Sequence, residues 1–393
     1  MKTIHSSLIK QTLTFLLIFL FVASSVAVKA GDGQKITIGE KFTIHSKALN
    51  EDRKIMVYTP TGYENSDAKY PVVYLLDGET HFVHAYGVVD FLSTQGLMPQ
   101  SIVVAIVNVD RGRDFTPSQI SEKSQTGGAA KFTAFIKDEL KPYINKNYRT
   151  QPFETIYGHS LGGMYVAYTF LTDPDMFDGY IAVSPYLQYD EDYVTKMVKE
   201  NLKDSYDHKF FYMTLGEEPA YYASVGQFVG TIETKAPKGL QFDYVQMTGA
   251  NHASTPHLTM YNGMQEFYSN WKLPKEAWEG GIAAADEHYK KLSQVYGYTI
   301  ETPEYVINQM GYNYMWADDF DKAVEVLSIN AKRFPGSANV YDSLGEALEK
   351  SGKLAEARNN YEKAVKLAKA ENNGFLKVYE ENLNRVQELV AEK

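Results

Sequence analysis

A serine flanked by glycines is the first group in this sequence that could do covalent chemistry. Residues 158–163 read GHSLGG, between a β-rich run at 154–158 and a run with helical spacing that begins at Met164. Glycines beside the serine permit a tight strand-to-helix turn, where larger side chains would collide with neighbouring backbone. We therefore expect Ser160 to be exposed at the carboxyl end of a strand, where its hydroxyl could act as a nucleophile.

The expected base is a histidine late in the chain, because a serine hydroxyl is a poor nucleophile until a base takes its proton. His252 follows the last expected strand, just before a helix, and is the preferred candidate among nine histidines. His257, on the first turn of that helix, is the reserve candidate. The alternative for His257 is an ordinary surface histidine.

An acidic residue is then needed to orient the base and stabilise its positive charge. Glu217 and Glu218 directly follow an expected strand at 208–215. We predict Glu218 as this acid, with Glu217 as the second choice. The alternative is that both glutamates are solvated loop charges.

Two backbone N–H groups must also hold the negative oxygen that forms when an ester carbonyl is attacked. The residue after the nucleophile, Leu161, is expected to supply one of them. The loop after the third expected strand, at 77–80, supplies the other, with the N–H of Glu79 as the candidate.

Composition excludes several kinds of site. Cysteine is absent, so disulfides, thiol nucleophiles and Cys-ligated metal centres are impossible. His81 and His84 are an isolated pair without a nearby third ligand, and no phosphate-binding glycine motif occurs. Acidic residues outnumber basic ones by 49 to 39, without the basic stripe that nucleic acid requires. We expect no metal, no cofactor and no nucleic-acid partner.

The elements that must position these residues alternate between β-rich and helical runs. The candidate strands are 35–45, 52–59, 71–76, 101–108, 154–158, 178–183, 208–215 and 240–247. This alternation is typical of βαβ units and a mostly parallel sheet. Continuous apolar runs at 72–76 and 102–107 indicate strands that are buried on both faces. The sequence predicts one α/β domain over residues 31–274.

Residues 275–393 form a second predicted domain, which is all helical. Residue types recur 34 positions apart, as at Gly311 and Gly345, and this is the tetratricopeptide period. We interpret residues 302–370 as two tetratricopeptide-like repeats. They would either present a groove to a protein partner, or to a second copy of the chain, or pack on the α/β domain. Packing on the domain is favoured because two repeats are few for a solenoid.

The first 30 residues have the order of a secretory signal peptide. Two lysines precede an apolar run at 13–22, and small residues lead to Ala30. We predict a periplasmic or secreted protein, cleaved near Ala30 and left without a membrane span. A retained anchor helix is the alternative. Without the three lysines of this segment, the formal net charge changes from −10 to −13.

Taken together, these features resemble the esterase branch of the α/β-hydrolases that includes siderophore esterases, S-formylglutathione hydrolases and mycolyltransferases. The similarity covers about 35–273 and rests on YLLDG at 74–78, DRGRDFTP at 110–117 and the turn at Ser160. The resemblance implies an α/β-hydrolase fold, here followed by an all-α helical-repeat domain.

The same resemblance implies a role for two arginines. The DRGRDFTP segment lies near the active-site mouth in that group, so Arg111 and Arg113 would help to position the substrate. The alternative for both is a structural salt bridge with Asp110 or Asp114.

These inferences predict an exported serine ester hydrolase that acts through Ser160, His252 and Glu218 on a small or medium carboxylic ester. A siderophore lactone and an acylated sugar are the substrates considered. Two alternatives stay open: an acyltransferase of the same fold, and a non-catalytic scaffold protein that works through its helical repeats.

Overall fold

The computed structural model describes residues 36–65, 67–371 and 373–391. The predicted signal peptide and its cleavage site lie outside these residues. Among the described residues, no helix is long and apolar enough to cross a membrane.

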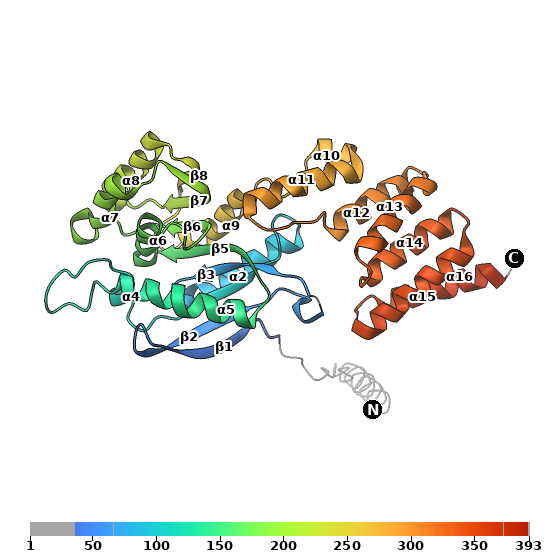
Figure 1. The fold of residues 1–393 in the computed structure, drawn as a ribbon, viewed down its shortest axis with the longest axis horizontal. Coiled ribbons are helices and arrows are strands. Elements are labelled where there is room, and N and C mark those ends of the chain that lie inside the picture. The colour runs from blue at the N-terminus through green and yellow to red at the C-terminus, as the bar shows by residue number, and fades with distance from the viewer. Residues whose placement is uncertain (1–35, 66, 372, 392–393) are drawn as a thin grey trace, which may run out of the picture. The chain divides into compact units, whose positions relative to one another are not determined.

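The N-terminal part of the described chain, up to residue 246, contains an eight-stranded sheet (Figure 1). Its strands are β1 (Glu40–Ser46), β2 (Glu51–Tyr58), β3 (Tyr70–Leu75), β4 (Ile102–Ile106), β5 (Thr150–His159), β6 (Gly179–Val183), β7 (Ser205–Leu215) and β8 (Lys238–Gln246). Their order is β1-β2-β4-β3-β5-β6-β7-β8. The β1/β2 and β2/β4 pairs are antiparallel and the other five are parallel, which confirms the predicted mostly parallel sheet.

The helices flanking the sheet are α2 (Gly78–Thr94), α3 (Arg111–Asp114), α4 (Ala129–Ala134), α5 (Lys141–Asn147), α6 (Leu161–Thr172), α7 (Tyr189–Asn201), α8 (Tyr222–Lys235) and α9 (Thr255–Phe267). Strand alternation shows which face two of them cover. On β5, the Tyr157 hydroxyl donates to the Pro256 carbonyl at the start of α9. The preceding residue of β5, Ile156, is paired with Tyr180 of β6, and the Tyr180 ring packs on Phe170 of α6. Because neighbouring residues of a strand point to opposite faces, α9 and α6 cover opposite faces of the sheet.

The central strands are buried as expected. Every residue of β3 and of β4 is buried, because helices cover both faces. The carboxyl ends of β3, β5, β6 and β7 therefore lie together at one edge of a rigid sheet. That edge is where we expected the reactive side chains.

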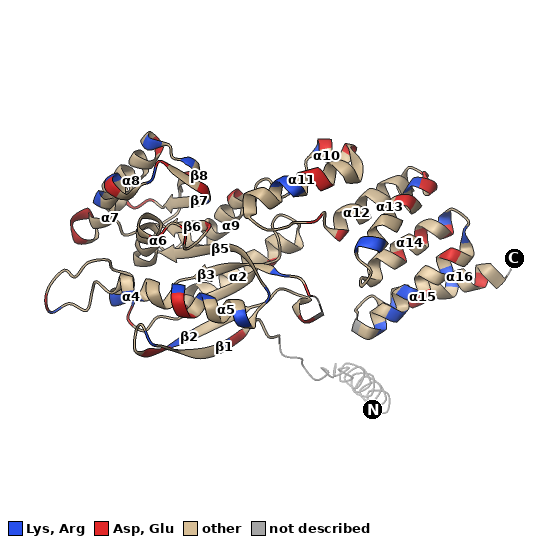
Figure 2. Cartoon of the chain, in the orientation of Figure 1, with Lys and Arg blue, Asp and Glu red and all other residues tan. Residues whose placement is uncertain are grey.

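The C-terminal part is helical, as predicted. It comprises α10 (Lys275–Glu279), α11 (Gly281–Tyr296), α12 (Glu304–Trp316), α13 (Phe320–Arg333), α14 (Ala338–Lys350), α15 (Leu354–Glu371) and α16 (Leu376–Ala391). Both acidic and basic residues occur in this helical part (Figure 2). A Cβ at Gly311 would lie 2.5 Å from the side chain of Leu327, and one at Gly345 would lie 2.8 Å from Tyr361. These glycines thus allow α12 to pack on α13 and α14 on α15, although the assignment to tetratricopeptide repeats stays a prediction.

Helix α11 is joined closely to the sheet part. The Tyr296 ring lies 5.1 Å from that of Phe153 and 6.0 Å from that of Phe210, and its hydroxyl donates to the Phe267 carbonyl at 2.8 Å. The described residues from Gly39 onward form one compact unit. The predicted division near residue 274 stays a prediction.

Candidate active site

Ser160 is the single residue between β5 and α6. Its backbone has φ 60° and ψ −116°, a conformation that is strained for a residue with a side chain. The turn is tight: a Cβ at Gly158 would overlap the carbonyl oxygen of Gly162, and one at Gly163 would lie 2.8 Å from the Val183 oxygen. Glycine at 158 and 163 is therefore required by close packing, and the turn holds Ser160 at the end of β5.

Two helix starts lie beside this serine, because β3 and β5 are neighbouring parallel strands that lead into α2 and α6. The first N–H groups of a helix have no partner within the helix. Leu161 opens α6 and Glu79 is the second residue of α2, so both candidate N–H groups are of this kind. The carboxylate of Glu79 accepts from the Asn108 side chain at 2.9 Å and from its backbone at 3.1 Å.

His252 lies against Glu218. Its Nδ1 is 2.5 Å from Glu218 Oε2, and the side chains are 39% and 9% exposed respectively. The other carboxylate oxygen accepts from the Ser184 hydroxyl at 2.6 Å and from the Gly216 N–H at 3.1 Å. One oxygen of Glu218 is therefore held by Ser184 and Gly216, and the other contacts His252 Nδ1. The Nε2 of the His252 ring is then free to accept a proton.

Glu217 has a different place. Its carboxylate accepts from the Gly249 N–H at 2.9 Å, and its own N–H donates to the Ala250 carbonyl at 2.7 Å. Glu217 thus fastens the loop that carries His252, and Glu218 contacts the imidazole itself.

Ser160 and His252 share two aromatic neighbours. The Tyr221 phenol lies beside the Ser160 side chain, and its ring meets the His252 ring edge-on at 5.6 Å. Burial, followed by the charge of Glu218, raises the pKa of Tyr221. The His159 ring lies 4.4 Å from that of His252. Among the described residues, Ser160 and His252 make no direct hydrogen bond, and such bonds often form only when the substrate is bound.

The reserve histidine, His257, lies at the far end of a series of ring contacts that runs from His252 through His159, His81 and His84. Its exposed side chain packs 5.6 Å from the His84 ring, and His84 Nε2 is 2.9 Å from His81 Nδ1. Burial lowers the pKa of His81 to about 4, and neighbouring His84 and Arg111 lower it further by smaller amounts. Burial also lowers the pKa of His84 to about 4, with a smaller effect from His257. Both are therefore neutral at pH 7.

Arg111 is paired inside the site. Its Nε donates to Asp77 Oδ1 at 2.6 Å and its Nη2 to Asp77 Oδ2 at 3.1 Å. Nη2 also donates to the His159 carbonyl at 2.9 Å. This arginine therefore links the start of α2 to the end of β5, and its predicted contact with substrate stays a prediction.

Arg113 lies in a second ionic cluster. It donates to Asp114 Oδ1 at 2.7 Å and to Glu51 Oε1 at 2.6 Å, and Asp114, fully buried, also accepts from Arg53 at 2.6 Å. Asp110 instead accepts from the Arg113 N–H at 2.9 Å and caps α3. A contact between Arg113 and substrate likewise stays a prediction.

Two residues at the site were not found from the sequence. Ser184, fully buried after β6, holds Glu218, and Tyr221, in the 3-10 turn Pro219–Tyr221, contacts Ser160 and His252. Both follow strands whose carboxyl ends lie at the site, β6 and β7. Nothing in the pattern around Tyr221 distinguishes it from the 29 other tyrosines.

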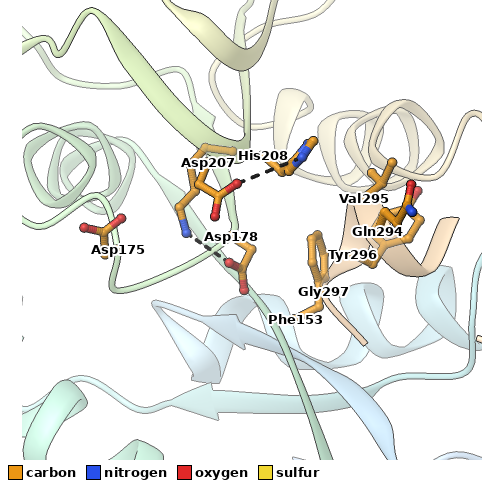
Figure 3. A pocket seen from close by; sticks show the side chains of 10 residues that line it. Phe153, Asp175, Asp178, Asp207, His208, Gln294, Val295, Tyr296 and Gly297 are labelled. Carbon is orange, nitrogen blue, oxygen red and sulfur yellow. Dashed lines mark hydrogen bonds and ion pairs between the residues drawn. The ribbon is translucent and has the colours of Figure 1, made fainter. Parts of the chain in front are cut away.

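A cavity of about 210 Å³ lies near the amino ends of β5 and β7, at the opposite end of these strands from Ser160 (Figure 3). It is bordered by the start of β7, by Phe153 near the start of β5 and by the end of α11. Lys209 pairs with Asp178 at 3.0 Å beside it. The cavity contains none of the candidate catalytic residues.

Comparison with known proteins places these features in context. Residues 46–218 match the family described as "Putative esterase". The chain is 35% identical over 153 residues to the ferri-bacillibactin esterase BesA of Bacillus subtilis, which covers 33% of this chain and 52% of that one. It is 30% identical over 190 residues to the uncharacterised protein YjcH of the same organism, covering 46% and 72%.

A solved structure extends the similarity. The crystal structure of an IroE-like serine hydrolase from Shewanella oneidensis has a TM-score of 0.65 and 26% identity, and the match covers 75% of this chain and 99% of that one. The predicted α/β-hydrolase sheet and its flanking helices are confirmed. The chain matches about half the length of the ferri-bacillibactin esterase.

Proposed function

The chain belongs to the putative esterase family of α/β-hydrolases, and from this premise we propose that it is a serine carboxylic-ester hydrolase with Ser160 as nucleophile. The observation that supports the proposal most is the 2.5 Å contact between His252 Nδ1 and Glu218 Oε2 beside a strained serine at the end of β5. Family membership alone would leave the reacting residues unassigned.

In the proposed reaction, His252 Nε2 takes the Ser160 proton while the serine oxygen attacks the ester carbonyl. The N–H groups of Leu161 and Glu79 stabilise the negative oxygen of the tetrahedral intermediate. His252 then gives the proton to the leaving alcohol, and an acyl-serine remains. Water attacks this acyl-serine by the same steps and releases the acid.

Glu218 acts through His252. Its carboxylate accepts a hydrogen bond from the Nδ1–H, so that Nε2 is the free nitrogen, and it stabilises the imidazolium that forms. Ser184 and Gly216 occupy the other carboxylate oxygen. This arrangement supports an acid that keeps one orientation throughout the reaction.

For the substrate we propose a small or medium carboxylic ester, with a siderophore lactone as the first compound to test. The support is the similarity to a protein described as a ferri-bacillibactin esterase. An acylated sugar is the second class to test. Export also stays a proposal, supported by the order of residue types at 1–30, as does a protein partner for the helical part.

The test compares wild type with Ser160→Ala on short p-nitrophenyl esters, a catecholate trilactone and an acetylated sugar, with and without an added alcohol. We expect Ser160→Ala to lose roughly 10³-fold or more in kcat with an unchanged fold. Ser205→Ala, an exposed serine at the start of β7, is the matched control and should keep full activity. Transfer of the acyl group to alcohol in preference to water would identify an acyltransferase. Full activity in Ser160→Ala would contradict the proposal.

A further inference from the structure

The His159 ring packs directly on the proposed base. His159 is the last residue of β5 and precedes Ser160, and its ring centroid lies 4.4 Å from that of His252 with the planes inclined by 44°. The proposed reaction leaves this residue without a role.

The surroundings of His159 keep its ring uncharged. Its Nε2 is buried and has no hydrogen-bond partner among the described residues. The groups that face it are His81 of α2, Asp77 at the start of α2, Arg111 of α3 and His252. Burial lowers the pKa of His159 to about 3, with further lowering by the neighbouring histidines and Arg111 that exceeds the opposite effect of Asp77.

We infer that His159 is a positioning residue for His252, with its neutral ring as the surface on which the base rests. The inference depends on the proposed roles of Ser160, His252 and Glu218. Glu218 holds the His252 ring at Nδ1, and Tyr221 meets it edge-on at 5.6 Å. One hydrogen bond leaves the ring free to tilt about that bond, and packing against His159 removes this freedom.

The absence of charge on His159 also suits the reaction. When His252 takes the Ser160 proton it becomes a cation, and a second cation with its ring centroid 4.4 Å away would oppose this step. A neutral ring in the same place does not oppose it.

Substitution can isolate the ring because the backbone of His159 is held independently. Its carbonyl accepts from Arg111 Nη2 at 2.9 Å, a contact that any side chain at this position retains. The turn at Ser160 should therefore persist when the imidazole is replaced.

The experiment compares His159→Phe, which keeps a neutral ring, with His159→Gln and His159→Ala, which do not. We expect the Phe variant to stay within about 3-fold of wild type, and the other two to lose about 10- to 100-fold in kcat with KM within about 3-fold, since small misplacement of a catalytic group costs about this much. His45→Ala, on the exposed edge strand β1, is the control and should be unaffected.

Outcomes for this residue and for the triad are separable. If Ser160→Ala is inactive while His159→Gln has the kcat of wild type, the positioning role is wrong and the proposed reaction stands. If Phe is impaired as much as Gln, neutral-ring packing is likewise overturned. Should the Ala variant fail to fold, the comparison of Phe with Gln decides. Activity in Ser160→Ala would instead remove the proposed function itself.

Discussion

Glu218 and Glu217 are adjacent in sequence but have separate tasks in the structure. Glu218 contacts the imidazole of His252, and Glu217 contacts the backbone of Gly249 in the loop that bears it. The two glutamates therefore provide a matched pair for substitution. A Gln at either position keeps the size and one acceptor oxygen, removes the negative charge and replaces the other oxygen with a donor NH2 group.

We expect Glu218→Gln to lower kcat by about 10²- to 10⁴-fold, because the amide cannot stabilise the imidazolium and can favour the wrong tautomer of His252. Glu217→Gln should stay within about 3-fold, because the amide oxygen can still accept from Gly249. Steady-state kinetics on one p-nitrophenyl ester checks both. Equal losses in the two variants would contradict the assignment of the acid.

At the scale of elements, the site is made by the junction of β3 with α2 and of β5 with α6. Arg111, from α3, spans this junction by its pairing with Asp77 and with the His159 carbonyl. Asp77 is 5% exposed, and burying a carboxylate is costly unless a cation is paired with it. Arg111 supplies that cation. The ionic link keeps the two helix starts together.

We expect Arg111→Ala to lower the free energy of unfolding by on the order of 3 kcal/mol, since Asp77 is left as a buried charge with Asn108 as its remaining partner. If Arg111 works by holding the start of α2 and the end of β5 together, kcat falls and KM changes little. If it binds substrate, KM rises. Urea unfolding together with kinetics distinguishes these roles, and an unchanged unfolding curve with a higher KM would contradict the structural role.

The sequence predicted elements better than contacts between them. The turn at Ser160 was recognisable because its glycines, the preceding strand and the following helix are all local. The continuous apolar runs likewise identified β3 and β4. The partner of Arg111 was not found: Asp110 and Asp114 are close in sequence, whereas Asp77 is brought near by the pairing of β3 with β4. Ser184 and Tyr221 were missed for the same reason, since each acts across strands.

At the scale of the whole molecule, α11 is part of the packing that supports the sheet. Tyr296 is 4% exposed and contacts Phe153, Phe210 and Phe267. Tyr296→Ala should lower the free energy of unfolding by about 3–5 kcal/mol, as for other large aromatic core residues. Gln294→Ala, two residues earlier in α11 and exposed, is the control. Thermal unfolding measures both, and equal melting temperatures would contradict this role for α11.

Buried histidines make the folded state sensitive to acid. In the unfolded chain a histidine takes up a proton near pH 6.5, whereas the folded state keeps His81 neutral down to about pH 4. The unfolded state therefore binds more protons between these values, and stability falls as pH decreases through this window. The effect is fully developed only below the folded pKa.

We expect wild type to lose about 1–2 kcal/mol more than His81→Gln when the pH is lowered from 7 to 5. Urea unfolding of both proteins at the two pH values gives this difference, and other titrating groups cancel because they are common to both. Identical losses would show that His81 has an ordinary pKa in the folded state.

The central claim, a nucleophilic serine at position 160, is tested most directly by covalent labelling. Wild type and Ser160→Ala would be treated with a fluorophosphonate, and intact mass followed by peptide mapping would locate the adduct. The account predicts one adduct per wild-type chain, on the peptide that contains Ser160, and none on the folded Ala variant. A folded wild type that stays unlabelled, or an adduct on another residue that persists in Ser160→Ala, would contradict it.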